Sequence, residues 1–391
     1  MTLSDHSPSG RPLSSRPWSG RLLFGSDKNC RPHRHRRGHR PHTGEQPIAL
    51  LLRGYSLADF LTGLPALRML RDALPEHRLV LAAPAEFAPL ARRAGPIDEL
   101  CPMDRLRVRA PPPQRPDLAV DLHGNGLASR ALLRSTQPTR LVAFGRNAPR
   151  WRAGEHEVAR WCRLVAEGLP ARAANYPGLL GVLPPSRDPV PGGVTILHCS
   201  ADSPARCWPA QRFAALAILL RERGHDVVIT ADHGDAGRAR AIAAASHTRA
   251  APLLPLRALC ALAQRARAVI STDTGVAHLA SVYATPSVVL FGPMSPRQFG
   301  PPHDPRHEVL WHGEDLRDPI NDVTAGNDAA ELPQLAEEAG GAAAGGDRQD
   351  RPAGEPCPAL SAISVHEVSA AVNRALSAHQ PHPGLLTLLD A

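Results

Sequence analysis

From residue 48 onward, short apolar runs alternate with longer stretches in which apolar residues recur at helical spacing, and this alternation constrains the fold more than any other feature. The apolar runs at 48–53, 78–83 and 118–122 are each followed by loop residues and then by a helical pattern. Runs of about four to eight apolar residues between helices are typical of the buried strands of a parallel sheet. The sequence therefore predicts an α/β protein made of βα units.

The same pattern returns after a stretch rich in proline and glycine at residues 184–193, which is the kind of segment that joins domains. Further strands are expected at 194–199, 226–230, 267–271 and 287–291. A helix after the first of them has Pro209 in its first turn and Gly224 just past its end. The predicted architecture is two Rossmann-like domains that face a cleft.

The expected boundaries follow from these patterns. The two domains cover residues 46–185 and 193–378, and a linker at 186–192 joins them. Residues 321–357 lose the pattern and are interpreted as a flexible excursion. Ser364 and Glu367 form a capping-box signal that opens a last helix over about 363–376, and residues 379–391 are a tail.

Composition places the chain among globular proteins. Its 391 residues suit two domains of roughly 100–200 residues each. Hydrophobic residues make up 43%, yet no apolar run approaches the ~20 residues that span a bilayer, and no signal-peptide core is recognisable. The seven scattered cysteines favour reduced thiols over disulfides or a zinc site. We expect a soluble cytoplasmic protein, and peripheral contact with the inner face of the cell membrane is compatible with this composition.

Positive charge is concentrated in an N-terminal arm, residues 1–45. Residues 1–44 hold nine Lys and Arg against two Asp, so +7 of the net charge of +8 lies there. The arm lacks apolar periodicity, and we expect it to be disordered. A basic tail can touch anionic lipid or nucleic acid and its histidines can bind a metal, but translation from an upstream start codon explains the composition equally well. The remaining chain has no basic stripe with interleaved aromatics, so nucleic acid is not an expected partner.

The most informative segment is STDTGVAHLA at residues 271–280, where a strand runs through a polar turn directly into a helix. Backbone N–H groups and the positive end of the helix dipole meet at such a junction, which favours an anion such as a diphosphate. Gly275 lets the backbone come close to a ligand, and the hydroxyls of Thr272 and Thr274 can donate to phosphate oxygens. The alternative is that Asp273 or Thr274 only caps the helix.

Two further loops leave strands of the same predicted sheet. Ser200 opens the loop SADSPARCWP, in which Arg206 can neutralise a phosphate leaving group. Asp235, in the loop ADHGD, can accept hydrogen bonds from a ribose diol. Taken singly, Arg206 can also be a solvated arginine and Asp235 an ordinary loop acid.

In the first domain, the loop GYSLAD brings Asp59 to the start of a helix expected over about 60–74. A carboxylate there can take a proton from an acceptor hydroxyl, and capping of the helix is the alternative role. His123 and Asn125, in the segment DLHGNG, are candidate contacts on the acceptor side. A structural role is the alternative for His123.

Together these segments resemble glycosyltransferase family 9, the heptosyltransferase family, over about residues 48–376. The matching segments occur in the family's order and spacing: LLRGYSLADFLTGLPALRMLRDALP, DLHGN, SPARCWPAQRFAALAILLRERGHDVVIT and STDTGVAHLASVYATPSVVLFGP. The resemblance implies a GT-B fold and transfer with inversion at the anomeric carbon. It implies a nucleotide-sugar donor, usually ADP-heptose, and a saccharide or glycolipid acceptor in lipopolysaccharide core synthesis.

The resemblance also implies roles for single residues. Asp59 matches the catalytic base, and Arg206 matches a basic residue near the leaving phosphates. Asp235 falls near an acidic residue that holds the donor ribose. The donor diphosphate loop is matched by Asp273, Thr274, Gly275 and His278. No carboxylate pair is spaced to hold a metal, so neither a metal nor another cofactor is expected.

The chain departs from the family pattern at three places. Ala58 stands where the family has Gly before the base, the loop at 198–201 reads HCSA, and the turn after residue 230 reads ADHGD. Because Gly→Ala closes backbone space and can strain a turn, a degenerate, catalytically weak sugar-nucleotide-binding member is one alternative. A nucleotide-sugar epimerase is a second, but it would need acid and base groups around one sugar. A third alternative is a sugar-nucleotide-binding protein without catalytic activity. Such a protein would not need Asp59, so the presence of Asp59 argues against it.

Overall fold

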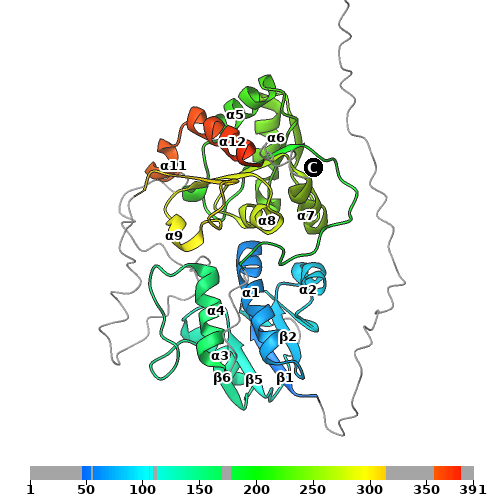
Figure 1. The fold of residues 1–391 in the computed structure, drawn as a ribbon, viewed down its shortest axis with the longest axis vertical. Helices are drawn as coiled ribbons and strands as arrows, with labels where there is room; N and C mark the ends of the chain where they lie inside the picture. The colour runs from blue at the N-terminus through cyan, green and yellow to red at the C-terminus, as the bar shows by residue number, and fades with distance from the viewer. Residues whose placement is uncertain are drawn as a thin grey trace, which may run out of the picture. The chain divides into compact units, whose positions relative to one another are not determined.

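The computed structural model describes residues 46–53, 56–104, 106–108, 112–169, 178–313 and 356–379, which are drawn in colour in Figure 1. The predicted arm (1–45) lies outside the described residues, as do residues 380–391 of the predicted tail and 321–355 of the predicted excursion. At the end of that excursion Cys357 is described, and it is buried.

The N-terminal half of the described chain forms a six-stranded sheet in the order β4-β3-β2-β1-β5-β6. All neighbouring strands are parallel except β3 and β4, which are antiparallel. The strands are β1 (Ile48–Leu52), β2 (Arg78–Ala83), β3 (Glu99–Asp104), β4 (Arg107–Val108), β5 (Leu118–Asp121) and β6 (Arg140–Val142).

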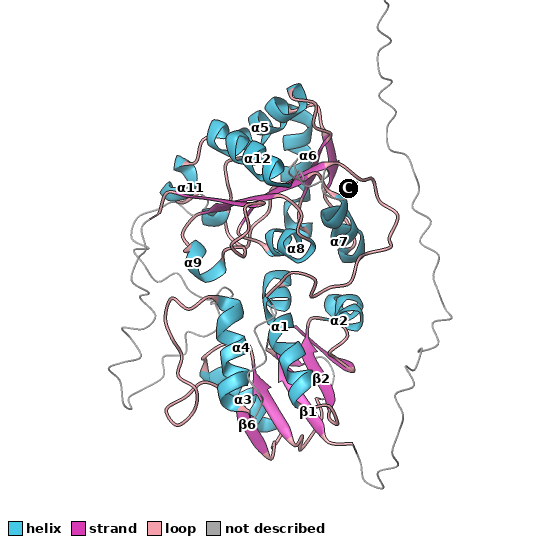
Figure 2. Ribbon diagram, in the orientation of Figure 1, coloured by secondary structure: helices cyan, strands magenta, loops and turns pink. Residues whose placement is uncertain are grey.

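Helices cover both faces of this sheet because successive strand residues point to opposite sides. In β1, Ala49 and Leu51 belong to the core under α1, α2 and α4, which lie in front of the sheet in Figure 2. Leu50 and Leu52 belong to the smaller core that contains Leu133 of α3. The helices are α1 (Leu57–Ala73), α2 (Ala88–Ala94, after the short η1, Ala85–Phe87), α3 (Leu127–Ser135) and α4 (Glu157–Gly168).

The C-terminal half forms a second six-stranded sheet, in the order β12-β11-β10-β7-β8-β9, and all of its neighbouring strands are parallel. Its strands are β7 (Thr195–His198), β8 (Val227–Thr230), β9 (Arg249–Ala251), β10 (Ala268–Thr272), β11 (Ser287–Phe291) and β12 (His307–Trp311). The predicted α/β class with parallel sheets is therefore confirmed.

Helices also cover both faces of the second sheet. Ile196 and Val269 face the core that contains α7 and α8, and Leu197 and Ile270 face the core that contains α5, α6 and α12. The helices of this half are α5 (Ala210–Glu222), α6 (Ala236–Ala245), α7 (Leu256–Arg265), α8 (Gly275–Tyr283), α9 (Pro296–Phe299), α11 (Pro358–Ala362) and α12 (Val365–His379), with η2 (Pro204–Arg206) and η3 (His233–Asp235).

Local signals in the sequence account for several helix ends. Gly224 follows the C-cap of α5 with φ of +79°, a left-handed conformation that glycine adopts without strain. The predicted capping box before α12 is present: the Ser364 N–H donates to Glu367 Oε2 (2.7 Å), and the Glu367 N–H donates to Ser364 Oγ (3.2 Å). α12 runs three residues beyond the predicted end at 376.

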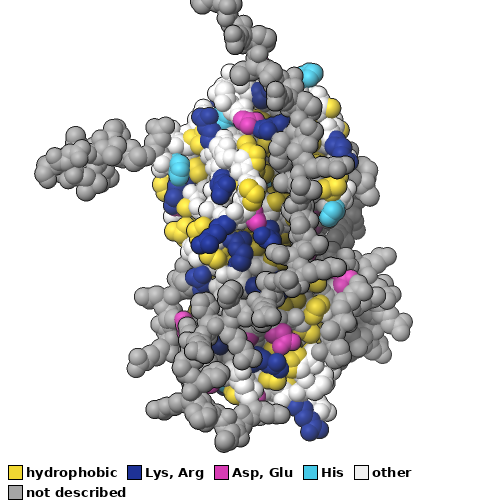
Figure 3. Space-filling view, turned by 90° about the vertical axis from the view of Figure 1, so that its right-hand side faces the viewer, with side chains coloured by type: hydrophobic (Ala, Val, Ile, Leu, Met, Phe, Trp, Pro, Cys, Tyr) yellow, Lys and Arg dark blue, Asp and Glu magenta, His cyan; other side chains and the backbone are white. Residues whose placement is uncertain are grey.

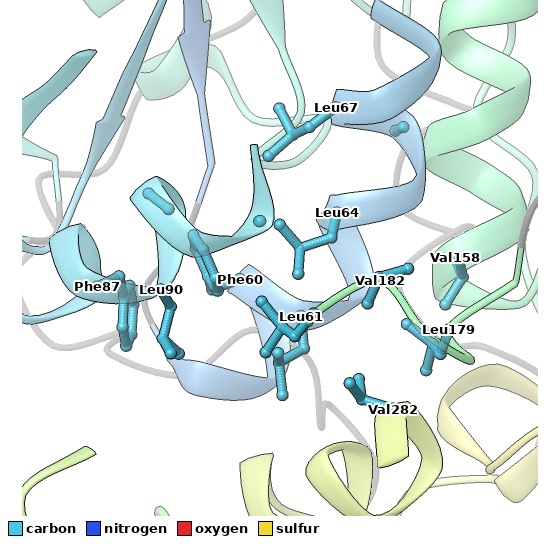
Figure 4. Close-up of a cluster of buried hydrophobic side chains, with 14 of the residues drawn as sticks. Phe60, Leu61, Leu64, Leu67, Phe87, Leu90, Val158, Leu179, Val182 and Val282 are labelled. Carbon is cyan, nitrogen blue, oxygen red and sulfur yellow. The ribbon is translucent and has the colours of Figure 1, made fainter. Parts of the chain in front are cut away.

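One hydrophobic core includes residues from both halves of the described chain. It contains Leu61 and Leu64 of α1, Val158 of α4, Val182 of the connecting segment and Val282 of α8. Figure 4 shows these side chains around the first turns of α1. The start of α1 is therefore packed by helices that belong to both sheets.

Candidate functional site

Asp59 lies in the first turn of α1, which begins at Leu57 and not near residue 60 as predicted. The earlier start has a local cause, because Ser56 has extended backbone and caps the helix. Its Oγ accepts from the Asp59 N–H (3.2 Å), and Asp59 Oδ2 accepts from the Ser56 N–H (3.2 Å) and from Ser56 Oγ (2.8 Å). Asp59 is thus the third helical residue of a capping box, and about one third of its side chain (34%) is exposed.

Ala58, at a departure from the family pattern, is the second residue of α1. It is not among the described residues with positive φ. An alanine fits a helical position without strain, so the strain considered for this substitution is not present.

Arg53, directly after β1, is a site neighbour that the sequence did not single out. Its guanidinium is buried and lies over the Trp161 ring, with 4.6 Å between Cζ and the ring centroid. Nη2 lies 3.7 Å from Asp59 Oδ1 and 3.1 Å from Glu157 Oε1. In the sequence, an arginine at the end of an apolar run indicates only that the strand ends there. No local pattern links it to its partner Glu157, which lies far away along the chain.

His123 lies in the loop after β5, and its backbone N–H donates to Asp121 Oδ1 (3.1 Å). Burial and, to a smaller extent, the charge of Arg53 lower the pKa of His123 to about 4, against the opposing effect of Asp59. His123 is therefore neutral at pH 7 and lies within the electrostatic reach of Asp59. Asn125 is exposed, and its carbonyl accepts from Arg130 Nη2 (2.8 Å).

At the carboxyl end of β10, residues 272–275 lead straight into α8. Thr274 is the N-cap residue, but its side chain makes no capping hydrogen bond, and its Oγ1 is buried without a hydrogen-bond partner. The alternative that the Thr274 side chain caps the helix is therefore wrong. The hydroxyl therefore lies at the N-terminus of α8 with its hydrogen-bonding capacity unused in the described structure.

Arg206 is held against this turn. Its Nη2 donates to the Asp273 carbonyl (2.7 Å) and carboxylate (3.0 Å), and its Nη1 donates to Asp202 (3.0 Å). Burial raises the pKa of Asp273 to about 6, although Arg206 acts in the opposite direction. Burial also lowers the pKa of His278, on the first turns of α8, to about 4. The alternative of a solvated arginine is wrong, because the Arg206 side chain is three-quarters buried (25% exposed).

Ser200 and Thr272 tie this turn to the neighbouring loops. Ser200 is buried, and its Oγ accepts from the Asp232 N–H (2.8 Å). Thr272 Oγ1 donates to the Ser200 carbonyl (3.4 Å). Asp235, the last residue of η3, is the N-cap residue of α6, and its side chain makes no capping hydrogen bond. The structure thus gathers the predicted donor-side residues on the carboxyl edge of the second sheet, with Asp235 in the adjoining loop.

Gly275 brings the two parts of the site together. A Cβ at this position would lie 2.6 Å from Leu57 Cβ, so the glycine allows α8 to approach the first turn of α1. The predicted reason for this glycine was close approach to a ligand, and the structure adds a packing reason. Asp59 is consequently close enough to influence the pKa values of Asp273 and His278.

Away from Asp59 and the start of α8, the described surface offers a groove and scattered groups of charged side chains. A groove of about 790 Å³ runs beside β6 and is lined by Arg140, Arg146, Arg150, Arg152 and neighbouring residues. On the face drawn in Figure 3, basic side chains form separate groups among hydrophobic and acidic ones.

Within the described ranges there is no cluster of three or more His, Cys, Asp or Glu placed to hold a metal ion. None of the described helices is long and apolar enough to cross a membrane.

Comparison with known proteins supplies independent information. Residues 137–319 match the model of glycosyltransferase family 9 (heptosyltransferase). The chain is 30% identical over 151 residues to lipopolysaccharide heptosyltransferase 1 of Pseudomonas aeruginosa, which is 37% of this chain and 41% of that protein. It is 25% identical over 297 residues to lipopolysaccharide heptosyltransferase 2 of Salmonella typhimurium, which is 65% of this chain and 85% of that protein. The alignment with the Pseudomonas protein thus spans less than half of that relative's length.

Solved structures show the same fold. A glycosyltransferase family 9 protein from Veillonella parvula matches with a TM-score of 0.63 and 17% identity, over 86% of this chain and 99% of that chain. The E. coli ADP-heptose LPS heptosyltransferase II matches with a TM-score of 0.59 and 20% identity, over 84% and 98%. Residues 137–319, somewhat less than half of the chain, are therefore similar to glycosyltransferase family 9 (heptosyltransferase), and the solved structures show that the chain has the GT-B fold.

Proposed function

We propose that this protein is an inverting glycosyltransferase that moves a heptose-like sugar from a nucleoside diphosphate donor, ADP-heptose, to a saccharide or lipid-linked acceptor in cell-envelope glycan synthesis. The observation that carries the proposal is the close packing of the first turn of α1 against the N-terminus of α8. A carboxylate at Asp59 and a helix N-terminus with Arg206 beside it meet where Gly275 packs against Leu57.

The donor side supports binding of a diphosphate. The N-terminus of α8 offers backbone N–H groups and a positive dipole end, the Thr274 hydroxyl has no partner, and Arg206 supplies a positive charge. The E. coli heptosyltransferase WaaC, which matches with a TM-score of 0.55 and 19% identity over 67% of this chain, has been solved with ADP. We therefore assign Ser200, Arg206, Asp235, residues 272–275 and His278 to the donor site.

The proposed chemistry is a direct displacement. The acceptor hydroxyl attacks the anomeric carbon as Asp59 takes its proton, and the bond between that carbon and the donor phosphate oxygen breaks. The electron pair leaves with the nucleoside diphosphate, whose charge Arg206 and the start of α8 stabilise. Because one face is attacked while the opposite bond breaks, the anomeric configuration inverts.

The acceptor side supports a hydroxyl-bearing and anionic acceptor. Neutral His123 lies near Asp59 and can exchange hydrogen bonds with a sugar hydroxyl. The groove beside β6 is lined by four arginines, Arg140, Arg146, Arg150 and Arg152, and by one acid, Glu167, which lies 3.6 Å from Arg152. The remaining positive charge favours acceptors with phosphate or carboxylate groups. Asn125, exposed in the loop after β5, remains a candidate contact.

The test is incubation of the purified chain with a panel of nucleotide sugars, with and without saccharide acceptors, and chromatography of the released nucleotide and the product. The proposal expects transfer from ADP-heptose and an inverted anomeric signal by NMR. Stable donor binding without transfer or hydrolysis would favour the alternative, a catalytically weak sugar-nucleotide-binding member of the fold.

A further inference from the structure

The guanidinium of Arg53 is fixed by four hydrogen bonds in the interior of the N-terminal half. Nε donates to the Asp59 carbonyl (2.8 Å), and Nη1 donates to the Leu122 carbonyl (2.8 Å). Nη2 donates to Thr62 Oγ1 (2.8 Å) and to Glu157 Oε1 (3.1 Å). Burying a charge is costly unless it is paired and hydrogen-bonded, so a fully buried arginine must be tightly held.

Two of these bonds fix the first two turns of α1 from inside. The bond to the Asp59 carbonyl holds the backbone of that residue, and the bond to Thr62 holds the next turn. The planar fork of an arginine can reach several acceptors at once, which the single ammonium of a lysine cannot do in the same geometry.

The Asp59 carboxylate is held on two sides. Ser56 occupies Oδ2 with a backbone and a hydroxyl hydrogen bond, and Arg53 Nη2 lies 3.7 Å from Oδ1. We propose that Arg53 is a positioning residue for Asp59: it anchors the first turn of α1, fixes the orientation of the carboxylate and places a positive charge beside it. This inference rests on the proposed role of Asp59 as general base.

The charges around Arg53 leave a positive surplus that acts on Asp59. Glu157 is shared, because its Oε2 accepts from Arg160 Nη1 (2.5 Å) while its Oε1 accepts from Arg53. Trp161 Nε1 also donates to Glu157 Oε1 (2.6 Å). Two guanidinium groups thus face one carboxylate, and Asp59 balances the remaining charge.

The other titratable groups that act on Asp59 do not replace this cation. His123, from the loop after β5, and His278, from α8, both have pKa values lowered to about 4 and are neutral at pH 7. Asp273, from the end of β10, is a like charge when ionised. In the described part of the chain, Arg53 is the basic residue within ion-pair distance of Asp59.

Three variants separate geometry from charge. Arg53→Lys keeps the positive charge but loses the fork, so kcat should fall about tenfold or more while the donor KM stays within about threefold of wild type. Arg53→Gln removes the charge, so the acid limb of the profile of kcat/KM against pH should move to higher pH. Glu157→Gln removes the competing carboxylate, so that limb should move to lower pH.

Opposite movements of the acid limb are a result that a merely structural role would not produce. Each variant is first checked for folding by near-UV circular dichroism and thermal denaturation. If Arg53→Gln does not fold, the downward movement in Glu157→Gln carries the test. A limb that does not move in Glu157→Gln, or that moves upward in it, would overturn the inference, as would Arg53→Lys with a kcat within threefold of wild type.

Failure of the proposed function gives a different pattern. If the wild-type chain transfers no sugar, or if Asp59→Asn turns over like wild type, the general-base assignment is wrong. If wild type is active and Asp59→Asn is inactive, but the Arg53 and Glu157 variants leave the pH profile unchanged, only the positioning role of Arg53 fails.

Discussion

The pairing of Arg206 with Asp273 gives a prediction that separates folding from donor binding. Asp273 is buried, and Arg206 is its hydrogen-bonded cation. Removing one partner of a buried pair typically costs 3–5 kcal/mol, and because Arg206 is 25% exposed we expect Arg206→Ala to lower the free energy of unfolding by about 2–3 kcal/mol at pH 8. The second substitution, Asp273→Asn, should restore most of this loss, because no buried charge is then left unpaired.

The effect of Arg206 on donor affinity should not depend on Asp273, unlike its effect on stability. A hydrogen bond to a charged group contributes about 1.5–3 kcal/mol, so loss of Arg206 should weaken ADP binding by about 10–100-fold. The weakening should appear in the wild-type and the Asp273→Asn backgrounds alike, because it reflects contact with the ligand and not the internal pair. Arg240→Ala, at an exposed position of α6, is the matched control and should change neither quantity.

The assays are urea denaturation for stability and isothermal titration calorimetry with ADP for affinity. Binding of ADP by Arg206→Ala as tightly as by wild type would contradict the prediction that Arg206 contacts the donor. Restoration of affinity together with stability in the double variant would also contradict it, because Arg206 would then act only through the fold.

Three further predictions follow from the same geometry. Gly275→Ala should lower the free energy of unfolding by about 1–3 kcal/mol, because its Cβ would lie 2.6 Å from Leu57 Cβ; an unchanged urea midpoint would show that α8 does not approach α1 this closely. The pKa of Asp273 is raised from 3.8 to about 6, so its contribution to stability is present below pH 3.8 and lost as the pH rises through 6. A bound diphosphate favours the protonated form further, so affinity for a nucleoside diphosphate sugar should fall from pH 6 to 8, and calorimetry should find no such fall in Asp273→Asn. Donor binding should persist in excess EDTA, and a loss that Mg²⁺ restores would mean that a metal bridges the phosphates.

Much of the fold could be predicted from local patterns. Strands β2 and β11 lie where the sequence predicted them, because each is a continuous apolar run that ends at polar or loop residues. Strands β3 and β9 gave no clear signal, since β3 contains Pro102 and acidic ends and β9 is the short segment RAA. Such strands form because a neighbouring strand offers hydrogen bonds, and that condition is not local in sequence.

The candidate site was predictable in part. The polar turns after strands could be found because parallel strands bring their carboxyl ends to one edge. The buried cluster around Arg53 could not, because it depends on Glu157 and Trp161, which α4 brings back beneath α1. The packing role of Gly275 was also hidden, since Leu57 belongs to the other half of the chain. The start of α1 was predictable in principle, because Ser56 and Asp59 form a capping-box pattern of Ser and an acid three residues later.

The most direct test of the account is turnover of Asp59→Asn with the donor and acceptor that the wild-type chain uses. Asparagine keeps an oxygen for the bonds from Ser56 but cannot take a proton, so kcat should fall by about 10²–10⁴-fold with donor affinity nearly unchanged. The matched control is Asp72→Asn, the same substitution at an exposed position of α1, which should leave turnover and stability close to those of wild type. Turnover of Asp59→Asn within about threefold of wild type would contradict the account, since Asp59 would then only stabilise the first turn of α1.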